Sequence, residues 1–261
     1  MMTAGPCRTL SASVEGTSLV FTGQPCAEYC SVEVVEGVGD VPLLVAVAAD
    51  GAGSAPGAPV GARLACVEVV RMGRDWAGRE PDFSTFEQVH VGAWVETASE
   101  RIRARALEDG LDPRDFACTL LVALVDGARG VFFQIGDGAI VYRNGADTFS
   151  PALWPQTGEY ANTTWFLTDE DAAERAQATA FDGVHEVALL TDGLQALALR
   201  FVSRDVHTPF FEPMFERLRR DRAEGDDLDG ELLRFLESEA VNARTDDDKT
   251  LVLASRRSPE A

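Results

Sequence analysis

The sequence predicts an α+β fold with antiparallel sheets. Apolar, β-rich segments come first, two long helical segments follow, and further strands come after them. Hairpin signals at Asp126-Gly127 and Asn144-Gly145 join several of the later strands. A doubly wound βαβ fold would instead alternate strands with helices along the whole chain. No internal repeat or linker interrupts the 261 residues, so we expect a single domain over residues 1–261.

The N-terminal half should supply three strands and two helices. The segment 42–49 is apolar on both faces, which is typical of a central strand in a buried sheet. Val91, Val95 and Ala98 begin an apolar stripe with helical spacing, and Pro81-Asp82 is a plausible start signal for that helix. The expected elements are strands at 8–16, 29–35 and 42–49 and helices at 58–73 and 83–108.

The C-terminal half returns to strands and ends with helices and one last strand. Its acidic segments, 169–183 and 221–229, are expected to be solvated loops. The expected strands are 116–125, 130–135, 139–143, 163–167, 185–191 and 249–254, and the expected helices are 210–220 and 228–241.

The charge balance limits the classes of partner. The chain has 43 acidic and 23 basic residues, a formal net charge of −20, which repels nucleic acid and anionic membrane. Two explanations of the acidic excess stay open at this point: a solvated surface, or carboxylates that converge on cations. Only the positions of the acids can separate them.

The cysteines and the apolar runs favour a cytoplasmic protein. The five cysteines form no paired CxxC pattern, which argues against zinc at Cys26 and Cys30, and Cys66 and Cys118 lie in apolar runs typical of buried thiols. The N-terminus lacks the apolar region of a secretion signal. The longest apolar run, 41–49, is too short to span a bilayer.

Aspartates stand at the ends of several core strands. Asp50, Asp137 and Asp192 each follow an apolar strand, and Asp247 lies just before the last one. Asp-Gly pairs also make good turns, which is the simpler explanation of any one of them. Several carboxylates brought together would repel one another unless cations or protons neutralise them. Hard oxygen ligands of this kind suit Mg²⁺ or Mn²⁺.

Four segments in register resemble the motifs of a known family. In the order VAVAADGAGSA, FQIGDGAIVYRNG, ALLTDGLQAL and TDDDKTLVLA, they look like the motifs of the PPM, or protein phosphatase 2C-like, metal-dependent serine/threonine phosphatases. The resemblance covers roughly residues 10–254 and is nearest to a bacterial branch whose first motif reads Asp-Gly-Ala-Gly-Ser. It implies a β-sandwich of two antiparallel sheets flanked by helix pairs.

The resemblance also implies a reaction and a set of metal ligands. It implies hydrolysis of phosphoserine or phosphothreonine on a partner protein by a water that bridges two Mg²⁺ or Mn²⁺ ions. It also implies a weaker third ion and a serine/threonine kinase as a partner. Asp50 and Asp192 would be the central catalytic ligands. The implied metal ligands are Asp50 as the bridging carboxylate, the carbonyl of Gly51, Asp192 and Asp247 on the first metal, Asp137 on a weaker third metal, and Glu28 on the second metal.

Three departures from the family pattern leave alternatives open. Ala52 replaces a histidine that serves as a general acid, and residues 23–28 lack the arginine that grips phosphate, for which Arg63 is a weak substitute. An acidic pair is reduced to Ala27-Glu28. The alternatives are therefore a catalytically weak family member that acts as a regulatory binding module, and a phosphatase for small phosphate esters.

Overall fold

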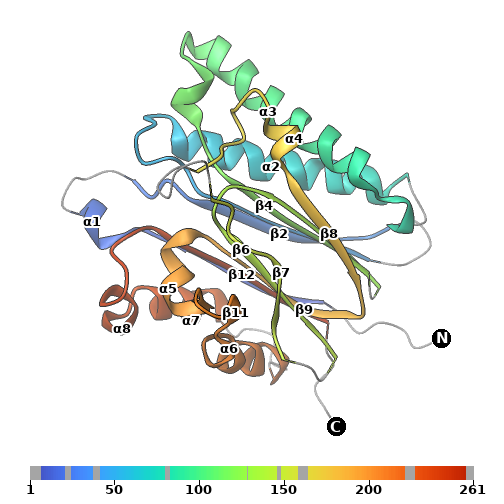
Figure 1. Cartoon of the computed structure of the whole chain (residues 1–261), viewed down its shortest axis with the longest axis vertical. Coiled ribbons are helices and arrows are strands. Elements are labelled where there is room, and N and C mark those ends of the chain that lie inside the picture. Colours follow the sequence, from blue (N-terminus) through green and yellow to red (C-terminus); the bar gives the residue numbers. More distant parts are fainter. Residues whose placement is uncertain are drawn as a thin grey trace.

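Two five-stranded antiparallel sheets stack face to face at the centre of the molecule (Figure 1). The strand order is β1-β12-β9-β6-β7 in one sheet and β2-β3-β4-β5-β8 in the other. This confirms the expected α+β class and the sandwich architecture. The computed structural model describes residues 7–20, 25–37, 42–79, 83–127, 129–145, 148–157, 164–220 and 227–256.

Each sheet contributes one layer, and helices lie outside both. The first sheet contains β1 (Arg8–Val14), β12 (Lys249–Ser255), β9 (Val184–Leu190), β6 (Ala139–Asn144) and β7 (Ser150–Leu153). The second sheet contains β2 (Tyr29–Val35), β3 (Leu43–Ala49), β4 (Leu120–Asp126), β5 (Arg129–Ile135) and β8 (Gln177–Asp182). The longer helices are α2 (Ala58–Ala77), α3 (Gln88–Asp109), α6 (Thr208–Arg220) and α7 (Leu228–Leu236). The short elements are α1 (Thr17–Val20), α4 (Ala172–Arg175), α5 (Gln195–Ala198), α8 (Glu239–Asn242) and the hairpin β10 (Leu199–Arg200) with β11 (Asp205–Val206).

Three apolar layers hold this arrangement together. Helices α2 and α3 cover the outer face of the second sheet, and α6 and α7 cover the outer face of the first (Figure 1). Between the sheets, small side chains such as Ala46, Ala48 and Ala123 pack around larger ones such as Phe132. All seven residues of β3 are buried, as expected for a central strand. Burial of apolar area on both faces is the main term that stabilises such a sandwich.

A close approach fixes helix α2 against the chain that leads into β4. A Cβ atom at Gly61 would lie 2.0 Å from the carbonyl oxygen of Phe116, closer than atoms can pack. Only glycine allows this approach. Helix α2 directly follows the loop after β3, so the contact also sets the position of that loop.

One expected strand is wrong. The expectation of a strand at 163–167 rested on the β-rich run of threonine, tryptophan and phenylalanine, yet no described residue of this stretch, 164–167, is in a strand. The N–H of Phe166 binds the Asp169 side chain at 2.9 Å, and the N–H of Leu167 binds the carbonyl of Cys118 at 2.8 Å. These backbone groups are therefore paired with loop atoms and not with a neighbouring strand.

Other boundaries also differ from the expectation. The segment 169–183 was expected to be a loop, but it contains α4 and the edge strand β8. Helix α3 begins at Gln88, where Glu87 and His90 form a capping box, and the start signal expected at Pro81-Asp82 lies outside the described residues. None of the described helices has the length and apolarity needed to cross a membrane.

Candidate metal centre

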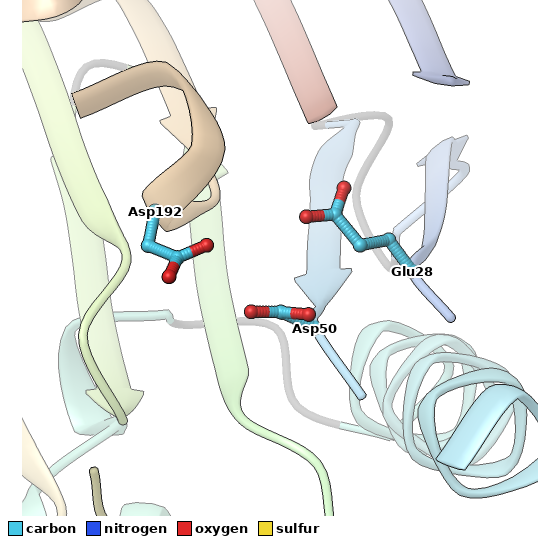
Figure 2. A group of neighbouring side chains, drawn as sticks. All are labelled: Glu28, Asp50 and Asp192. Atoms are coloured by element: carbon cyan, nitrogen blue, oxygen red, sulfur yellow. The ribbon is translucent and has the colours of Figure 1, made fainter. Parts of the chain in front are cut away.

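Three carboxylates from distant parts of the sequence meet at one end of the sandwich. Asp50 follows β3, Asp192 follows β9, and Glu28 precedes β2. One carboxylate oxygen from each lies within 4.8 Å of the others. Figure 2 shows the three side chains pointing toward a common centre. The spacing is short enough for a single cation to contact all three.

A cleft of about 560 Å³ opens over this group. The cleft is lined by Asp50, Asp192, Asp137 and Asp247, so the four aspartates singled out in the sequence lie around one cavity. Gly51 also lines it and pairs with Cys118 across an isolated bridge. The remaining lining comes largely from the loop between β3 and α2, with Thr119, Thr164 and Phe166 also in the wall.

Glu28 lies beneath the cleft, and no described residue forms an ion pair with it. Its side chain is buried, and neither carboxylate oxygen accepts a hydrogen bond from a described residue. Burial raises the pKa of Glu28 well above its usual range, and the nearby hydroxyls of Thr250 and Thr191 oppose this only in part. A buried carboxylate without a partner is costly. A divalent cation between Glu28 and Asp50 would remove that cost, so the residues present fit a metal ion.

The pKa values of Asp50 and Asp192 are raised for the same reason. Burial raises the pKa of Asp50 well above its usual range, and the charges of Glu28 and Asp192 raise it further. Burial, followed by the charges of Asp137 and Asp247, raises the pKa of Asp192 to about 6. Like charges at short range disfavour the ionised form of each group. The cluster therefore favours bound cations at neutral pH.

Backbone hydrogen bonds hold the aspartates in place. The N–H of Asp50 donates to the Thr119 hydroxyl at 3.0 Å, and the N–H of Thr119 donates to the Asp50 carbonyl at 2.7 Å. The Thr164 hydroxyl binds the carboxylate of Asp137, and the side-chain amide of Gln195 donates to the Asp137 carbonyl at 2.6 Å. These hydrogen bonds restrain the positions of Asp50 and Asp137 at the cleft.

Two residues that the sequence analysis did not single out organise the centre. The buried carboxylate of Asp248 accepts hydrogen bonds from the N–H groups of Gly16 and Ala27, each at 2.7 Å. Asp248 therefore joins the segment that carries Glu28 to the loop that carries Asp247. Lys249 is fully buried, and its ammonium group donates to the carbonyl of Asp247 at 3.2 Å. The run of three acids before a buried strand was the only sequence signal.

The structure does not support Arg63 as a substitute for the phosphate-gripping arginine. Arg63 is exposed on α2 and does not line the cleft. Among the described residues, no arginine, lysine or histidine lines it, and Ala52 lies in its wall. Residues 21–24, which cover part of the stretch compared with the family's arginine motif, lie outside the described residues.

Comparisons with known proteins agree on one family. The family model described as protein phosphatase 2C matches residues 15–237. The serine/threonine-protein phosphatase 3 of Escherichia coli (strain K12) is 41% identical over 250 residues, which cover 95% of this chain and 97% of that protein.

Solved structures show the same fold. A bacterial serine phosphatase superposes with a TM-score of 0.67 at 13% identity, covering 97% of this chain and 99% of the other. The catalytic domain of the serine threonine protein phosphatase PstP, in complex with two manganese ions, superposes with a TM-score of 0.63 at 18% identity, covering 95% and 97% of the two chains.

Proposed function

Because this chain belongs to the protein phosphatase 2C family, we propose that it removes phosphate from serine and threonine side chains of another protein in a metal-dependent reaction. The identity to a serine/threonine-protein phosphatase over nearly the full length of both chains supports this. We also propose that residues 1–261 form a single phosphatase domain. We further propose that the protein is cytoplasmic, because its five free cysteines suit a reducing compartment.

The observation that carries this proposal is the buried Glu28 beneath the cleft, which forms no ion pair with any described residue. A solvated acidic surface has water around every carboxylate, whereas Glu28 is buried beside Asp50 and Asp192 with no hydrogen bond to either oxygen from a described residue. Such a group is retained where a cation compensates it. The pattern favours a metal centre over the explanation of Asp-Gly pairs as ordinary turns.

The proposed ligands form an inner and an outer group. Glu28, Asp50 and Asp192 form the inner group, and oxygen ligands of this type suit Mg²⁺ or Mn²⁺. Asp137, Asp247 and the carbonyl of Gly51 form the outer group along the same cleft and would complete the coordination of a second or third ion.

When bound, divalent cations would activate water and neutralise the phosphoryl oxygens of the substrate. The protein's own contribution is to position the reacting groups. Asp50 and Asp192 would hold the cations. The Thr119 hydroxyl accepts a hydrogen bond from the N–H of Asp50, the Asp248 carboxylate accepts one from the N–H of Ala27, and these bonds hold the flanking backbone. Phosphoryl transfer depends largely on positioning and on charge neutralisation, so no side chain has to attack the phosphorus.

A two-substrate assay tests this function. We expect Mn²⁺-dependent phosphate release from a phosphoserine peptide, no release in a chelator, and release from a sugar phosphate at least about tenfold slower. Asp50→Asn should lose at least about a hundredfold in rate while it keeps the fold, because the substitution removes a charge from the cluster and not an apolar contact.

The outcomes separate the alternatives. Turnover of the sugar phosphate as fast as the peptide would instead favour a phosphatase for small esters. Absence of Mn²⁺-dependent release from any phosphate ester would favour the regulatory binding module, with a phosphoprotein or its kinase as the bound partner.

A further inference from the structure

A second cleft, of about 470 Å³, lies beside the metal centre. Its lining includes Trp154, which follows β7, and Gln177, which begins β8. These two strands are the edge strands of the two sheets and lie side by side (Figure 1). Its wall combines indole rings, guanidinium groups and amides. The residues that carry the argument are Trp154, Gln156, Trp165, Arg175, Gln177 and Arg204.

Each arginine in this cleft lies over a tryptophan. The guanidinium carbon of Arg175 is 3.4 Å from the centre of the Trp165 ring, and that of Arg204 is 5.7 Å from the Trp154 ring. Arg175 also pairs with Asp171 at 2.7 Å. Arg204 is exposed and forms no ion pair with any described residue. Stacking on the Trp154 ring orients the Arg204 guanidinium but does not use its N–H groups, which can bind an anion.

The rim of the cleft adds apolar surface next to Arg204. Phe201 is half exposed and packs edge-on against Trp154, with ring centres 5.5 Å apart, and Val202 is fully exposed. Arg204 has a φ of 51°, a left-handed conformation that non-glycine residues rarely adopt. The tip of the β10–β11 hairpin therefore presents an oriented cation and apolar side chains together.

One segment of the chain forms walls of both clefts. Trp165 lines the second cleft, whereas its neighbours Thr164 and Phe166 line the metal cleft. Gln156 lines the second cleft, and its side-chain oxygen accepts a hydrogen bond from the N–H of Gly136, the residue before Asp137, at 2.6 Å. An extended peptide could reach from one cleft into the other within a few residues.

We propose that the second cleft binds an acidic segment of the phosphoprotein substrate, close in sequence to the phosphorylated residue. This inference rests on the proposed function and names the substrate class. The chain has 43 acidic and 23 basic residues, so most of its surface repels acidic partners. The guanidinium group of Arg204 provides a local positive charge, and its planar form suits carboxylates. Arg175 is already paired with Asp171 and contributes the wall of the cleft. Arg204 is the specificity-determining residue of this subsite.

Peptide kinetics test the subsite. Three substrates are compared. In the first peptide, Asp and Glu flank the phosphoserine on both sides, and in the second, Asn and Gln replace them. The third substrate is an aryl phosphate, which occupies only the metal cleft. We expect a roughly three- to tenfold preference of kcat/KM for the acidic peptide, carried mainly by KM. Arg204→Gln should abolish the preference and leave the aryl phosphate rate unchanged. Arg101→Gln, at an exposed arginine of α3, removes the same charge elsewhere on the surface. It should change neither the preference for the acidic peptide nor the aryl phosphate rate.

The possible failures are distinguishable. An acidic preference that survives in Arg204→Gln, or that Arg101→Gln reduces equally, overturns the subsite, because general charge then explains it. A wild-type protein that hydrolyses the aryl phosphate without preferring acidic peptides also overturns it, while the proposed function stands. No Mn²⁺-dependent hydrolysis of any substrate would contradict the proposed function and this inference together.

A binding measurement gives a readout without catalysis. Trp154 and Trp165 line the cleft, so an unphosphorylated acidic peptide should change tryptophan fluorescence, with an affinity that falls as salt rises. Arg204→Gln should weaken this binding roughly three- to tenfold. A second peptide, with one phosphoserine in place of the acidic cluster, shows whether phosphate is the preferred anion, and tighter binding of that peptide would overturn the assignment to carboxylates. Equal binding of an unphosphorylated peptide with Asn and Gln in place of Asp and Glu would contradict the proposal.

Discussion

At the scale of single residues, Ala52 sets a specific limit on the chemistry. It lies in the wall of the metal cleft, and no described histidine, lysine or arginine lines that cleft. A serine alkoxide is a strong base and leaves poorly without a proton, whereas a nitrophenolate leaves unaided. General acid catalysis contributes about 10²–10⁴-fold where a suitable group is present. The protein should therefore favour aryl phosphates over phosphoserine peptides in kcat.

The substitution Ala52→His tests this limit. We expect it to raise kcat for a phosphoserine peptide at least about tenfold and kcat for p-nitrophenyl phosphate much less, because only the peptide needs the proton. The measurement is kcat for both substrates in both proteins between about pH 6 and 9. A wild-type protein equally fast on both substrates would show that another group supplies the proton. So would a variant that binds metal normally yet gains nothing on the peptide.

Asp192 should make the metal-free protein less stable as the pH rises. Its pKa is about 6 in the folded chain and about 4 in the unfolded chain, so the folded state binds this proton more tightly. The contribution to the free energy of unfolding is therefore present at low pH and is lost as the pH rises from about 4 to 6. Burial also raises the pKa values of Asp50 and Glu28, so these groups act in the same direction.

Urea unfolding in a chelator at about pH 5 and pH 8 measures this effect. Wild type should lose more free energy of unfolding between the two pH values than Asp192→Asn, by about 1–2 kcal/mol. The carboxylates that both proteins share contribute to the pH dependence of both, so the difference between the two proteins reports on Asp192. Equal pH dependence in the two proteins would show that Asp192 is not crowded in solution.

At the scale of elements, helix α2 depends on a glycine at its contact with Phe116. A methyl group at position 61 would meet the Phe116 carbonyl at 2.0 Å, so Gly61→Ala should lower the free energy of unfolding by about 1–3 kcal/mol or more. At Gly92, within α3, a methyl group would find no heavy atom within 4 Å. Gly92→Ala should therefore raise stability by up to about 1 kcal/mol. Denaturant unfolding of both variants checks the pair, and destabilisation of similar size in both would contradict the packing account.

Elements with strong periodic patterns were predictable, and weakly patterned ones were not. The buried strand at 42–49 and the helical stripe from Val91 agree with β3 and α3. The strand expected at 163–167 is wrong because composition does not reveal where backbone N–H groups bind. Strand β8 was missed because an edge strand exposes half of its side chains and so resembles a polar loop.

At the scale of the whole molecule, the sandwich brings together residues that are far apart in sequence. Strand ends at Asp50, Asp137 and Asp192 could be identified as a group, because apolar strands that end on aspartate recur. The roles of Asp248 and Lys249 could not, since they depend on contacts such as that between Asp248 and Gly16, 232 positions away. The second cleft likewise combines loops whose meeting no local pattern predicts.

We propose that the carboxylates at the end of the sandwich hold the metal ions on which phosphate release depends. Crystals equilibrated with Mn²⁺ and measured at the manganese absorption edge locate the ions directly by anomalous scattering. We expect anomalous peaks between Glu28, Asp50 and Asp192, and loss of these peaks in Asp50→Asn crystals treated identically. Peaks confined to other parts of the surface would contradict the claim. Peaks unchanged by Asp50→Asn would contradict it equally.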